Sequence, residues 1–445
     1  MKLLFIHQNF PGQYKLIVPR LAQMGGHEIV CLGDEKNLKG RVMNLPGVRL
    51  MAYPEPQGAG GATHHYVRNL EACVRRGQSV VRALLKLRED GFVPDVVCAH
   101  SGWGESLFVK DIFPEAKLLA FMEFYYRARG SDVAFDPEFP SQLDDLFRVR
   151  IKNAAMQMSL TAMDWGVTPT RWQWQQQPVE YRDRISVIHD GIDTDLVRPD
   201  PNAVFTVPER GLTFRPGDEV VTFVNRNLEP YRGFHTFMRA LPEMQRRRPG
   251  AHFLVVGGDE VSYGKAAPEG TTYRQIYSQE VAGRVDFDRV HFLGRIAYDR
   301  YLAMLQVSAC HVYLTYPFVL SWSMLESMAA GCALVGSATP PVQEVLRDGE
   351  NGLLVDFFSP DALAATVERV LADPDRMAGM RAKARETVVR DYDLNTVCLP
   401  RHVRLIEDLA AGRLGREGAA AAPMAPALRR VMAEREARLR NKTGR

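Results

Sequence analysis

Short apolar runs of the β type alternate along the chain with longer stretches of helical periodicity. This alternation is typical of parallel sheets covered by helices. The runs predict strands at 2–7, 28–32, 48–53, 94–99, 117–122, 164–168 and 185–189 in the first half, and at 219–225, 252–257, 290–293, 309–314, 332–337 and 353–356 in the second half. The predicted fold class is therefore α/β, with parallel sheets.

A chain of 445 residues exceeds the size at which one hydrophobic core keeps growing. The Pro-rich, polar stretch 198–217 is the natural seam between two halves that each read as a Rossmann-like unit. The domains we expect are an N-terminal unit over 1–199, a second unit over 200–393, a crossover helix over 394–411 that packs back on the first unit, and a linker with a basic tail over 412–445.

Charge is distributed unevenly along the chain. Residues 411–445 hold nine Lys or Arg against three Asp or Glu, whereas the whole chain carries only +3. The body is therefore slightly acidic, and it offers no basic groove for nucleic acid. The tail, with a predicted short helix at Leu428–Arg440, fits either a peripheral contact with an anionic membrane surface or a plain solvated terminus.

Six cysteines occur without a C-x-x-C pair, which favours buried thiols in a reducing compartment. The strand pattern directly after Met1 is too short for a signal peptide, and no run of about 18 apolar residues occurs. We expect a cytoplasmic protein that is at most peripheral to a membrane.

Ligands of open parallel sheets bind at the carboxyl ends of the strands, so the loops that follow strands are the places to search. Three such loops in the first half contain Gly12, His100 and Glu123. Gly12 fits either a plain turn or a close approach to an anion, and His100 fits either a structural or a catalytic histidine. Glu123 lies among aromatic residues, where a carboxylate needs a partner or a function.

In the second half, Arg226 and Arg232 flank a short loop between a strand and a helix that starts near Gly233. Two fixed cations beside a helix start suit a diphosphate, because they neutralise charge on a departing phosphate oxygen. The alternative is a solvated loop with surface arginines.

Glu326 lies in a predicted short helix, which a turn separates from the strand at 309–314. With Ser323 it matches the S-x-x-E capping box, which is a purely structural role. A carboxylate at this place could equally accept two hydrogen bonds from a ribose diol. Local spacing does not separate the two.

Other fingerprints are missing. Gly58–Thr63 resembles part of G-x-G-x-x-G but follows no strand, and no P-loop or H-E-x-x-H motif occurs. The D-x-D tripeptide Asp193–Asp195 lies in the segment between the two halves.

Taken together, the loops resemble the family 4 glycosyltransferases, retaining enzymes of the GT-B fold in which two Rossmann-like domains with parallel sheets face each other across a cleft. The resemblance covers almost all of residues 1–410. It rests on the order and spacing of six segments: Phe10–Gly12, Ile188–Asp193, Arg226–Gly233, Phe292–Gly294, Leu325–Cys332 and Pro341–Val345 followed by Asp348–Val355.

The resemblance implies that a nucleotide sugar lies on the second domain. Its diphosphate would contact Arg226 and Arg232, its ribose Glu326, and its base Leu293, Gly294 and Arg295. The family has a Glu for the donor sugar where this chain has Phe318, so the N–H groups of Leu320 and Ser321 are the expected substitutes.

In the first domain, the resemblance implies that Gly12 lets the backbone approach the diphosphate. It also implies that His100 or Glu123 orients the acceptor hydroxyl or accepts its proton. Glu123 stands where many relatives have a His. No metal ion and no cofactor are expected beyond the donor.

The function predicted on this basis is metal-independent, retaining transfer of a sugar from a nucleotide sugar to a carbohydrate or lipid-linked acceptor, in bacterial cell-surface polysaccharide or glycoconjugate synthesis. Two alternatives remain. One is a nucleotide-sugar epimerase of the same fold, which would turn over its donor without an acceptor. The other is a noncatalytic binding subunit, motivated by Phe318.

Overall fold

The structure is a computed structural model that describes residues 1–39 and 45–414. The chain forms two compact units. Within the described residues, unit 1 consists of Met1–Arg129, Ser141–Asp190 and 398–414, and unit 2 of Gly130–Pro140 and Gly191–Val397. Most of the predicted basic tail, with the helix predicted at Leu428–Arg440, lies outside the described residues.

Unit 1 is built on a parallel sheet with the strand order β3-β2-β1-β4-β5-β6-β7. The described part of the unit places seven strands in this sheet, and each overlaps a run predicted from the sequence. Their bounds are β1 Lys2–Ile6, β2 Glu28–Asp34, β3 Val48–Tyr53, β4 Val96–His100, β5 Lys117–Phe121, β6 Trp165–Thr168 and β7 Ile185–Val187.

Helices cover both faces of this sheet, as parallel crossovers require. They are η1 Gly12–Tyr14, α1 Ile17–Met24, α2 Glu35–Leu38, α3 Arg68–Glu89, α4 Val109–Ile112, α5 Leu143–Lys152, α6 Ala154–Ala162, α7 Arg171–Gln176, η2 Val179–Arg184 and α15 Leu399–Ala410.

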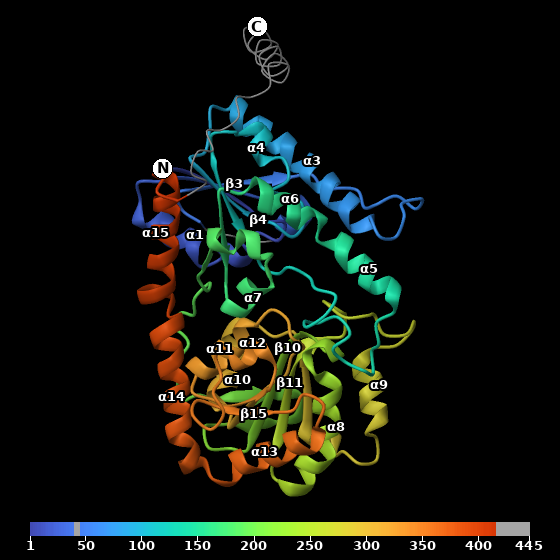
Figure 1. Ribbon diagram of the computed structural model, residues 1–445. Coiled ribbons are helices and arrows are strands. Elements are labelled where there is room, and N and C mark those ends of the chain that lie inside the picture. The colour runs from blue at the N-terminus through green and yellow to red at the C-terminus, as the bar shows by residue number, and fades with distance from the viewer. Residues whose placement is uncertain (40–44, 415–445) are drawn as a thin grey trace. The chain divides into compact units, whose positions relative to one another are not determined.

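The strands of unit 1 send alternate side chains to two cores. On β1, Leu4 and Ile6 join the apolar cluster that includes Leu84 of α3, whereas Leu3 and Phe5 join the cluster on the opposite face. That second cluster is completed by α1 and by Ile406 of α15, and the two helices lie side by side (Figure 1). Helix α15, near the end of the described chain, therefore covers apolar side chains of the first strand.

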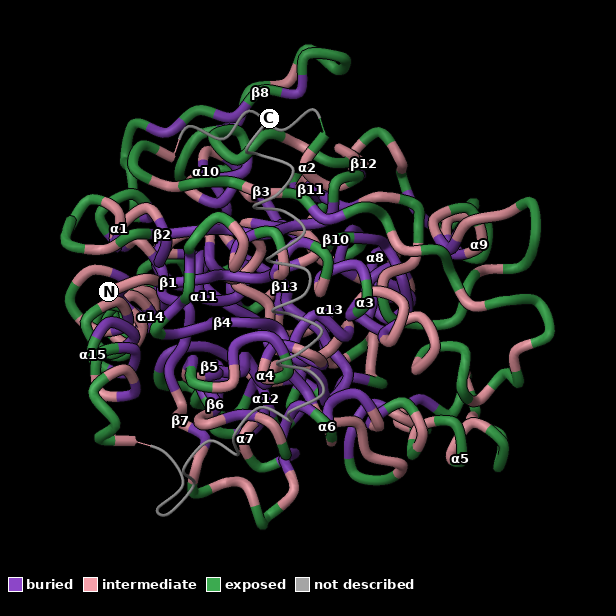
Figure 2. Tube along the Cα trace, turned by 90° about the horizontal axis from the view of Figure 1, so that it is seen from above, coloured by how far each residue is buried: buried purple, intermediate pink, exposed green. Residues whose placement is uncertain are grey.

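Unit 2 contains a second parallel sheet, with the strand order β12-β11-β10-β13-β14-β15. Buried residues are purple in Figure 2, and they make up all of β13, most of β11 and residues 220–223 of β10. The bounds are β10 Val220–Asn227, β11 His252–Gly258, β12 Val290–Gly294, β13 Cys310–Tyr313, β14 Ala333–Ser337 and β15 Leu353–Val355.

Several helices of unit 2 begin at side-chain caps. Ser359 and Asp373 each accept a backbone N–H three residues on, and each precedes a proline at the first helical position. The helices are η3 Pro208–Arg210, η4 Pro230–Arg232, α8 Phe234–Arg247, α9 Tyr273–Glu280, η5 Phe287–Arg289, α10 Tyr298–Val307, α11 Trp322–Ala329, α12 Pro340–Gln343, α13 Pro360–Ala372, α14 Pro374–Tyr392 and the π-helix η6 Leu394–Cys398.

The structure differs from the sequence prediction in three places. Residues 191–199 belong to unit 2, so the boundary lies at 190/191 and not at 199/200. The predicted seam contains an antiparallel hairpin of β8 Phe205–Val207 and β9 Leu212–Phe214, whose apolar residues face the core of unit 2. The segment Gly130–Pro140 packs in unit 2, although its neighbours on both sides belong to unit 1.

Candidate active site

The predicted arginine pair lies at the carboxyl end of β10. Arg226 is the second-to-last residue of the strand, and its exposed guanidinium makes no ion pair or hydrogen bond with any residue that the structure describes. Arg232 ends the short helix η4, directly before the start of α8. Gly233 between them adopts φ +72°, and a Cβ there would overlap the side chain of Leu314. The sharp turn therefore brings Arg232 close to the helix start.

Arg232 is almost fully buried, and one of its nitrogens is already engaged. Nη1 donates to Oγ1 of Thr315 at 2.7 Å and to the carbonyl of Val319 at 2.9 Å. The guanidinium carbon lies 5.1 Å from the ring centre of Tyr263 and 5.6 Å from that of Phe318. Nε and Nη2 make no hydrogen bond within the described chain, so these two donors remain for a ligand.

Glu229, in the same loop, holds the segment after β11. Its buried carboxylate accepts the backbone N–H groups of Ser262, Tyr263 and Gly264 at 3.1, 3.2 and 2.8 Å. A carboxylate that accepts three N–H groups fixes the backbone around it. This contact places the ring of Tyr263 over Arg232.

The predicted base-binding residues lie at the carboxyl end of β12. Leu293 and Gly294 are partly exposed, and Gly294 has φ +63°. Arg295 donates to Oδ1 of Asn227 at 3.2 Å and pairs with Glu260. Arg295 thus joins the loops that follow three neighbouring strands, where a flat base could lie.

Glu326 makes contacts that differ from both sequence interpretations. Its buried carboxylate accepts the hydroxyls of Tyr298 and Tyr301 of α10 at 2.7 and 2.9 Å. The capping-box interpretation is wrong, because the N-cap of α11 is Ser321 and Ser323 lies inside the helix. Each carboxylate oxygen keeps a further lone pair, so Glu326 can still accept a diol.

The turn that replaces the family's first Glu is apolar. Phe318 is buried, with its ring centre 5.1 Å from that of Tyr231 and 5.0 Å from that of Tyr263. The N–H of Ser321 already donates to the hydroxyl of Tyr313 at 2.8 Å, so the prediction that it holds the sugar is not supported. Leu320 is buried in the core of unit 2.

In unit 1, the loops after β1, β4 and β5 bring four polar side chains together. The Gln13 amide donates from Nε2 to Oε1 of Glu123 at 3.0 Å, and its oxygen accepts from Nε2 of His7. Nε2 of His100 lies 3.4 Å from Oε2 of Glu123. Both predicted residues, His100 and Glu123, are therefore in one network with His7 and Gln13.

Backbone contacts set the tautomers of both histidines. Nδ1 of His7 accepts the N–H of Asn9, and Nδ1 of His100 accepts the N–H of Gly102, each at 3.0 Å. In the neutral form of either ring the proton is therefore on Nε2, which faces Gln13 in the case of His7 and Glu123 in the case of His100. Burial raises the pKa of Glu123, but the hydrogen bonds and charges of His100, His7 and Gln13 outweigh it and hold the pKa below its ordinary value.

The backbone of Glu123 is fixed by a hydrogen bond, whereas part of its side chain is exposed. Gln173 donates to its backbone carbonyl at 2.6 Å, whereas 29% of its side chain is exposed. His100 by contrast is buried and stacks on Trp103 with ring centres 3.8 Å apart. Of the two predicted groups, Glu123 is the one that solvent or a substrate can reach.

Gly12 is required by its neighbour. Its φ is +48°, and a Cβ would overlap the imidazole of His7. The contact is internal to unit 1, and it holds the ring that positions Gln13.

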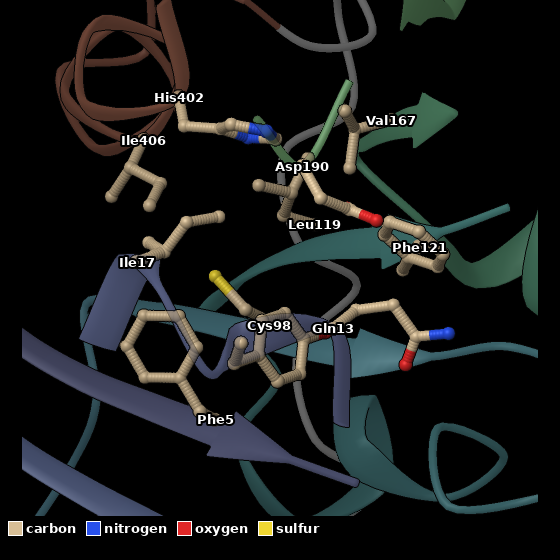
Figure 3. A pocket seen from close by; sticks show the side chains of 11 residues that line it. Phe5, Gln13, Ile17, Cys98, Leu119, Phe121, Val167, Asp190, His402 and Ile406 are labelled. Carbon is tan, nitrogen blue, oxygen red and sulfur yellow. The ribbon is translucent and has the colours of Figure 1, made fainter. Parts of the chain in front are cut away.

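A small cavity lies behind Gln13, between the sheet of unit 1 and helix α15 (Figure 3). Ile17 of α1 and Ile406 of α15 close it on one side, and Asp190 and Gln13 lie at its edge. Its volume of about 20 Å³ holds one water molecule and is too small for a sugar.

Several members of the site were missed at the sequence level. His7 and Gln13 lie in a loop that was singled out only for its glycine. Glu105, whose buried carboxylate accepts the N–H of Gln8 at 2.6 Å, lies in the loop of His100. Burial raises the pKa of Glu105. For His7 and Glu105 the available signal was an ionisable residue shortly after a buried strand, whereas the amide of Gln13 gave no such signal.

Two parallel α/β units, each with polar groups at the carboxyl ends of its strands, define the GT-B class of fold. Family models agree with this class: the model described as glycosyl transferase family 4 group matches residues 25–197, and the one described as glycosyl transferases group 1 matches residues 209–387. The chain belongs to family 4 of the glycosyltransferases.

The chain is similar to the GDP-mannose-dependent alpha-(1-6)-phosphatidylinositol monomannoside mannosyltransferase of Mycolicibacterium smegmatis, at 32% identity over 51% of this chain and 56% of that protein. It is also similar to the D-inositol 3-phosphate glycosyltransferase of Rhodococcus jostii, at 29% identity over 52% of this chain and 54% of that protein. The chain spans about half the length of the curated relatives it matches.

Solved structures share the fold at low identity. HepE of Anabaena in complex with UDP has a TM-score of 0.63 at 15% identity, over 92% of this chain and 100% of that one. Sucrose-phosphate synthase of Thermosynechococcus elongatus has a TM-score of 0.68 at 17% identity, over 93% and 100%. Within the described residues, no helix combines the length and apolar character that crossing a bilayer requires.

Proposed function

We propose that this chain transfers a sugar from a nucleoside-diphosphate donor held by unit 2 to a hydroxyl of an acceptor held by unit 1. The observation that carries the proposal is the arginine pair at the end of β10. Arg226 has a free guanidinium, and Arg232 keeps Nε and Nη2 without a hydrogen bond in the described chain. These donors match the oxygens of a diphosphate.

The donor would be bound by residues from three parts of unit 2. Arg226 and Arg232 neutralise the diphosphate, whose negative charge grows as the bond to the sugar breaks. Glu326 accepts the ribose hydroxyls through lone pairs that Tyr298 and Tyr301 leave open. Leu293, Gly294 and Arg295 face the base.

The acceptor hydroxyl would meet Glu123. Its lowered pKa makes it an anion at neutral pH, and its exposed face can accept a hydrogen bond from a hydroxyl. His100 and Gln13 fix the orientation of this carboxylate. Glu123 orients the hydroxyl or accepts its proton, and His100 acts through Glu123.

We further propose retention of the anomeric configuration and independence of metal ions. Retention follows from the family resemblance. Metal independence is supported by the guanidinium groups, which supply positive charge where a divalent cation would otherwise stand against the phosphates.

The names of the relatives narrow the substrates. Those relatives are named for GDP-mannose and for phosphatidylinositol or inositol-phosphate acceptors, and HepE was solved with UDP. We propose a hexose donor on GDP or UDP and a polyol acceptor that is a carbohydrate or a lipid-linked headgroup, in glycolipid or cell-surface glycan synthesis.

Phe318 is the observation that favours a second candidate, a noncatalytic subunit that binds the nucleotide sugar. It fills with a buried ring the place where the family has a carboxylate for the donor sugar. Such a subunit would bind a donor without consuming it.

Release of nucleoside diphosphate from GDP-mannose and UDP-glucose, with and without inositol, tests these candidates. A transferase releases diphosphate faster when an acceptor is present. An epimerase would consume the donor at the same rate with and without an acceptor. It would convert the sugar of the donor and would release no nucleoside diphosphate. Donor binding without any turnover would identify the noncatalytic subunit.

A further inference from the structure

The segment Gly130–Pro140 is a strap that leaves unit 1 after Arg129, packs in unit 2 and returns to unit 1 at Ser141. It contains no helix or strand, yet Asp132 and Asp136 are buried. A buried carboxylate is costly unless hydrogen bonds satisfy it. The partners of these two aspartates therefore indicate what the strap does.

Both aspartates accept hydrogen bonds from tyrosines of the proposed donor site. The hydroxyl of Tyr231 donates to Oδ2 of Asp132 at 2.6 Å, and that of Tyr316 donates to Oδ2 of Asp136 at 2.8 Å. Nε2 of His235 lies 3.1 Å from the same oxygen of Asp136. The strap is thus bonded to the turn after β10 and to the turn after β13.

These two turns hold Arg232. Tyr231 directly precedes Arg232, and the N–H of Tyr316 donates to the carbonyl of Tyr231 at 3.1 Å. Thr315, next to Tyr316, accepts from Nη1 of Arg232 at 2.7 Å. Hydrogen bonds, together with the peptide links of Tyr231 to Arg232 and of Thr315 to Tyr316, therefore connect the strap with the guanidinium through both tyrosines.

The rest of the strap anchors it independently of the turns. Glu138 makes a two-point ion pair with Arg239, at 2.6 and 2.9 Å, and Lys265 donates to the carbonyl of Pro140. Ala134 has φ +56°, and it is the only non-glycine residue with a positive φ in the described chain. A backbone conformation of this kind persists where the surrounding contacts impose it.

We propose that Asp132 and Asp136 are positioning residues for the donor diphosphate, which act through Tyr231 and Tyr316 to preorganise Arg232. The inference rests on the proposed function and adds that a segment outside the nucleotide-binding loops sets donor affinity. Without the strap contacts, the turns must be ordered on binding, and that ordering weakens the affinity. The effect falls on donor binding and not on the chemical step.

The test uses the full-length protein and isothermal titration with UDP and GDP, together with donor KM and kcat. Tyr231→Phe and Tyr316→Phe each delete one hydroxyl, and Asp132→Ala deletes the acceptor of the first bond. Each should weaken the diphosphate Kd about tenfold, the effect of one hydrogen bond to a charged group. Donor KM should rise by a similar factor, with kcat within about twofold of the parent.

Two further variants separate positioning from general loosening. Asp132→Asn keeps an acceptor oxygen and should restore most of the affinity lost in Asp132→Ala. Glu138→Gln weakens the strap's anchor but touches neither turn, so its Kd should stay within about twofold of the parent. If Asp132→Ala does not fold, the two Tyr→Phe variants decide the question alone.

The outcomes are distinguishable. If the parent protein binds neither UDP nor GDP, the proposed function falls and this inference with it. If the parent binds but both Tyr→Phe variants bind equally well, only this inference is overturned. A fall in kcat at unchanged KM would also overturn it, because a positioning role in donor binding predicts the opposite split.

Discussion

Substitution of Arg226 by alanine removes an exposed guanidinium that has no partner in the described chain. The change leaves no cavity and no unsatisfied group, so the free energy of unfolding should change by no more than about 0.5 kcal/mol. In the transition state, one well-placed charge-stabilising donor contributes about 2.7–4 kcal/mol. The expected loss in kcat is therefore about 100-fold to 1,000-fold.

Arg232 is a less suitable first target because its Nη1 holds Thr315 and Val319. Its loss would leave a buried turn without a donor and would mix stability with activity. Arg347→Ala is the matched control for Arg226→Ala, since it removes another exposed arginine of unit 2, whose ion pair with Glu350 lies on the surface.

The assay is steady-state release of nucleoside diphosphate, run with thermal denaturation of each variant. Arg226→Lys keeps the charge without the two-point geometry and should fall between the parent and the alanine variant. Turnover of Arg226→Ala within about threefold of the parent, at unchanged melting temperature, would refute its role at the diphosphate.

Three further predictions follow from named contacts. Glu326→Gln should raise the KM for the donor about tenfold and should have a much smaller effect with a 2′-deoxyribose donor, which kinetics with both donors would detect. Gly12→Ala should destabilise unit 1 and lower activity because its Cβ overlaps the His7 ring, and a chemical denaturation curve with an unchanged midpoint would contradict this. Burial lowers the pKa of His402 to about 4, against about 6.5 in the unfolded chain. Because the unfolded chain then binds the extra proton, the free energy of unfolding should fall as the pH drops from about 7 to about 4. The variant His402→Gln should flatten this pH dependence in urea titrations.

The strands were predictable because buried parallel strands are short, continuous apolar runs, and all thirteen predicted runs overlap a strand of the two large sheets. The hairpin of β8 and β9 was missed because its three-residue strands lie among prolines and charged residues. Length and composition give no signal for so short a strand pair.

Candidate site residues could be predicted only where a polar or charged residue lies at the end of a strand or directly after it. Arg226, Glu123 and His100 were proposed as candidates on that basis, and their roles stay predictions. Tyr298 and Tyr301 were not, since they lie on a helix about 25 residues before Glu326 and meet it only after folding. The strap was missed for the same reason, because a local pattern carries no information on which unit a loop packs against.

Helix α15 has a consequence for synthesis on the ribosome. The first strands of unit 1 emerge with one apolar face that Ile406 and Leu409 must cover, and those residues are translated after the whole of unit 2. A nascent chain halted anywhere between residues 200 and 397 therefore exposes this apolar face of the sheet, to which chaperones can bind. Expression of the N-terminal half as a separate piece should need α15 grafted to it, or added in trans as a peptide, before it remains in solution.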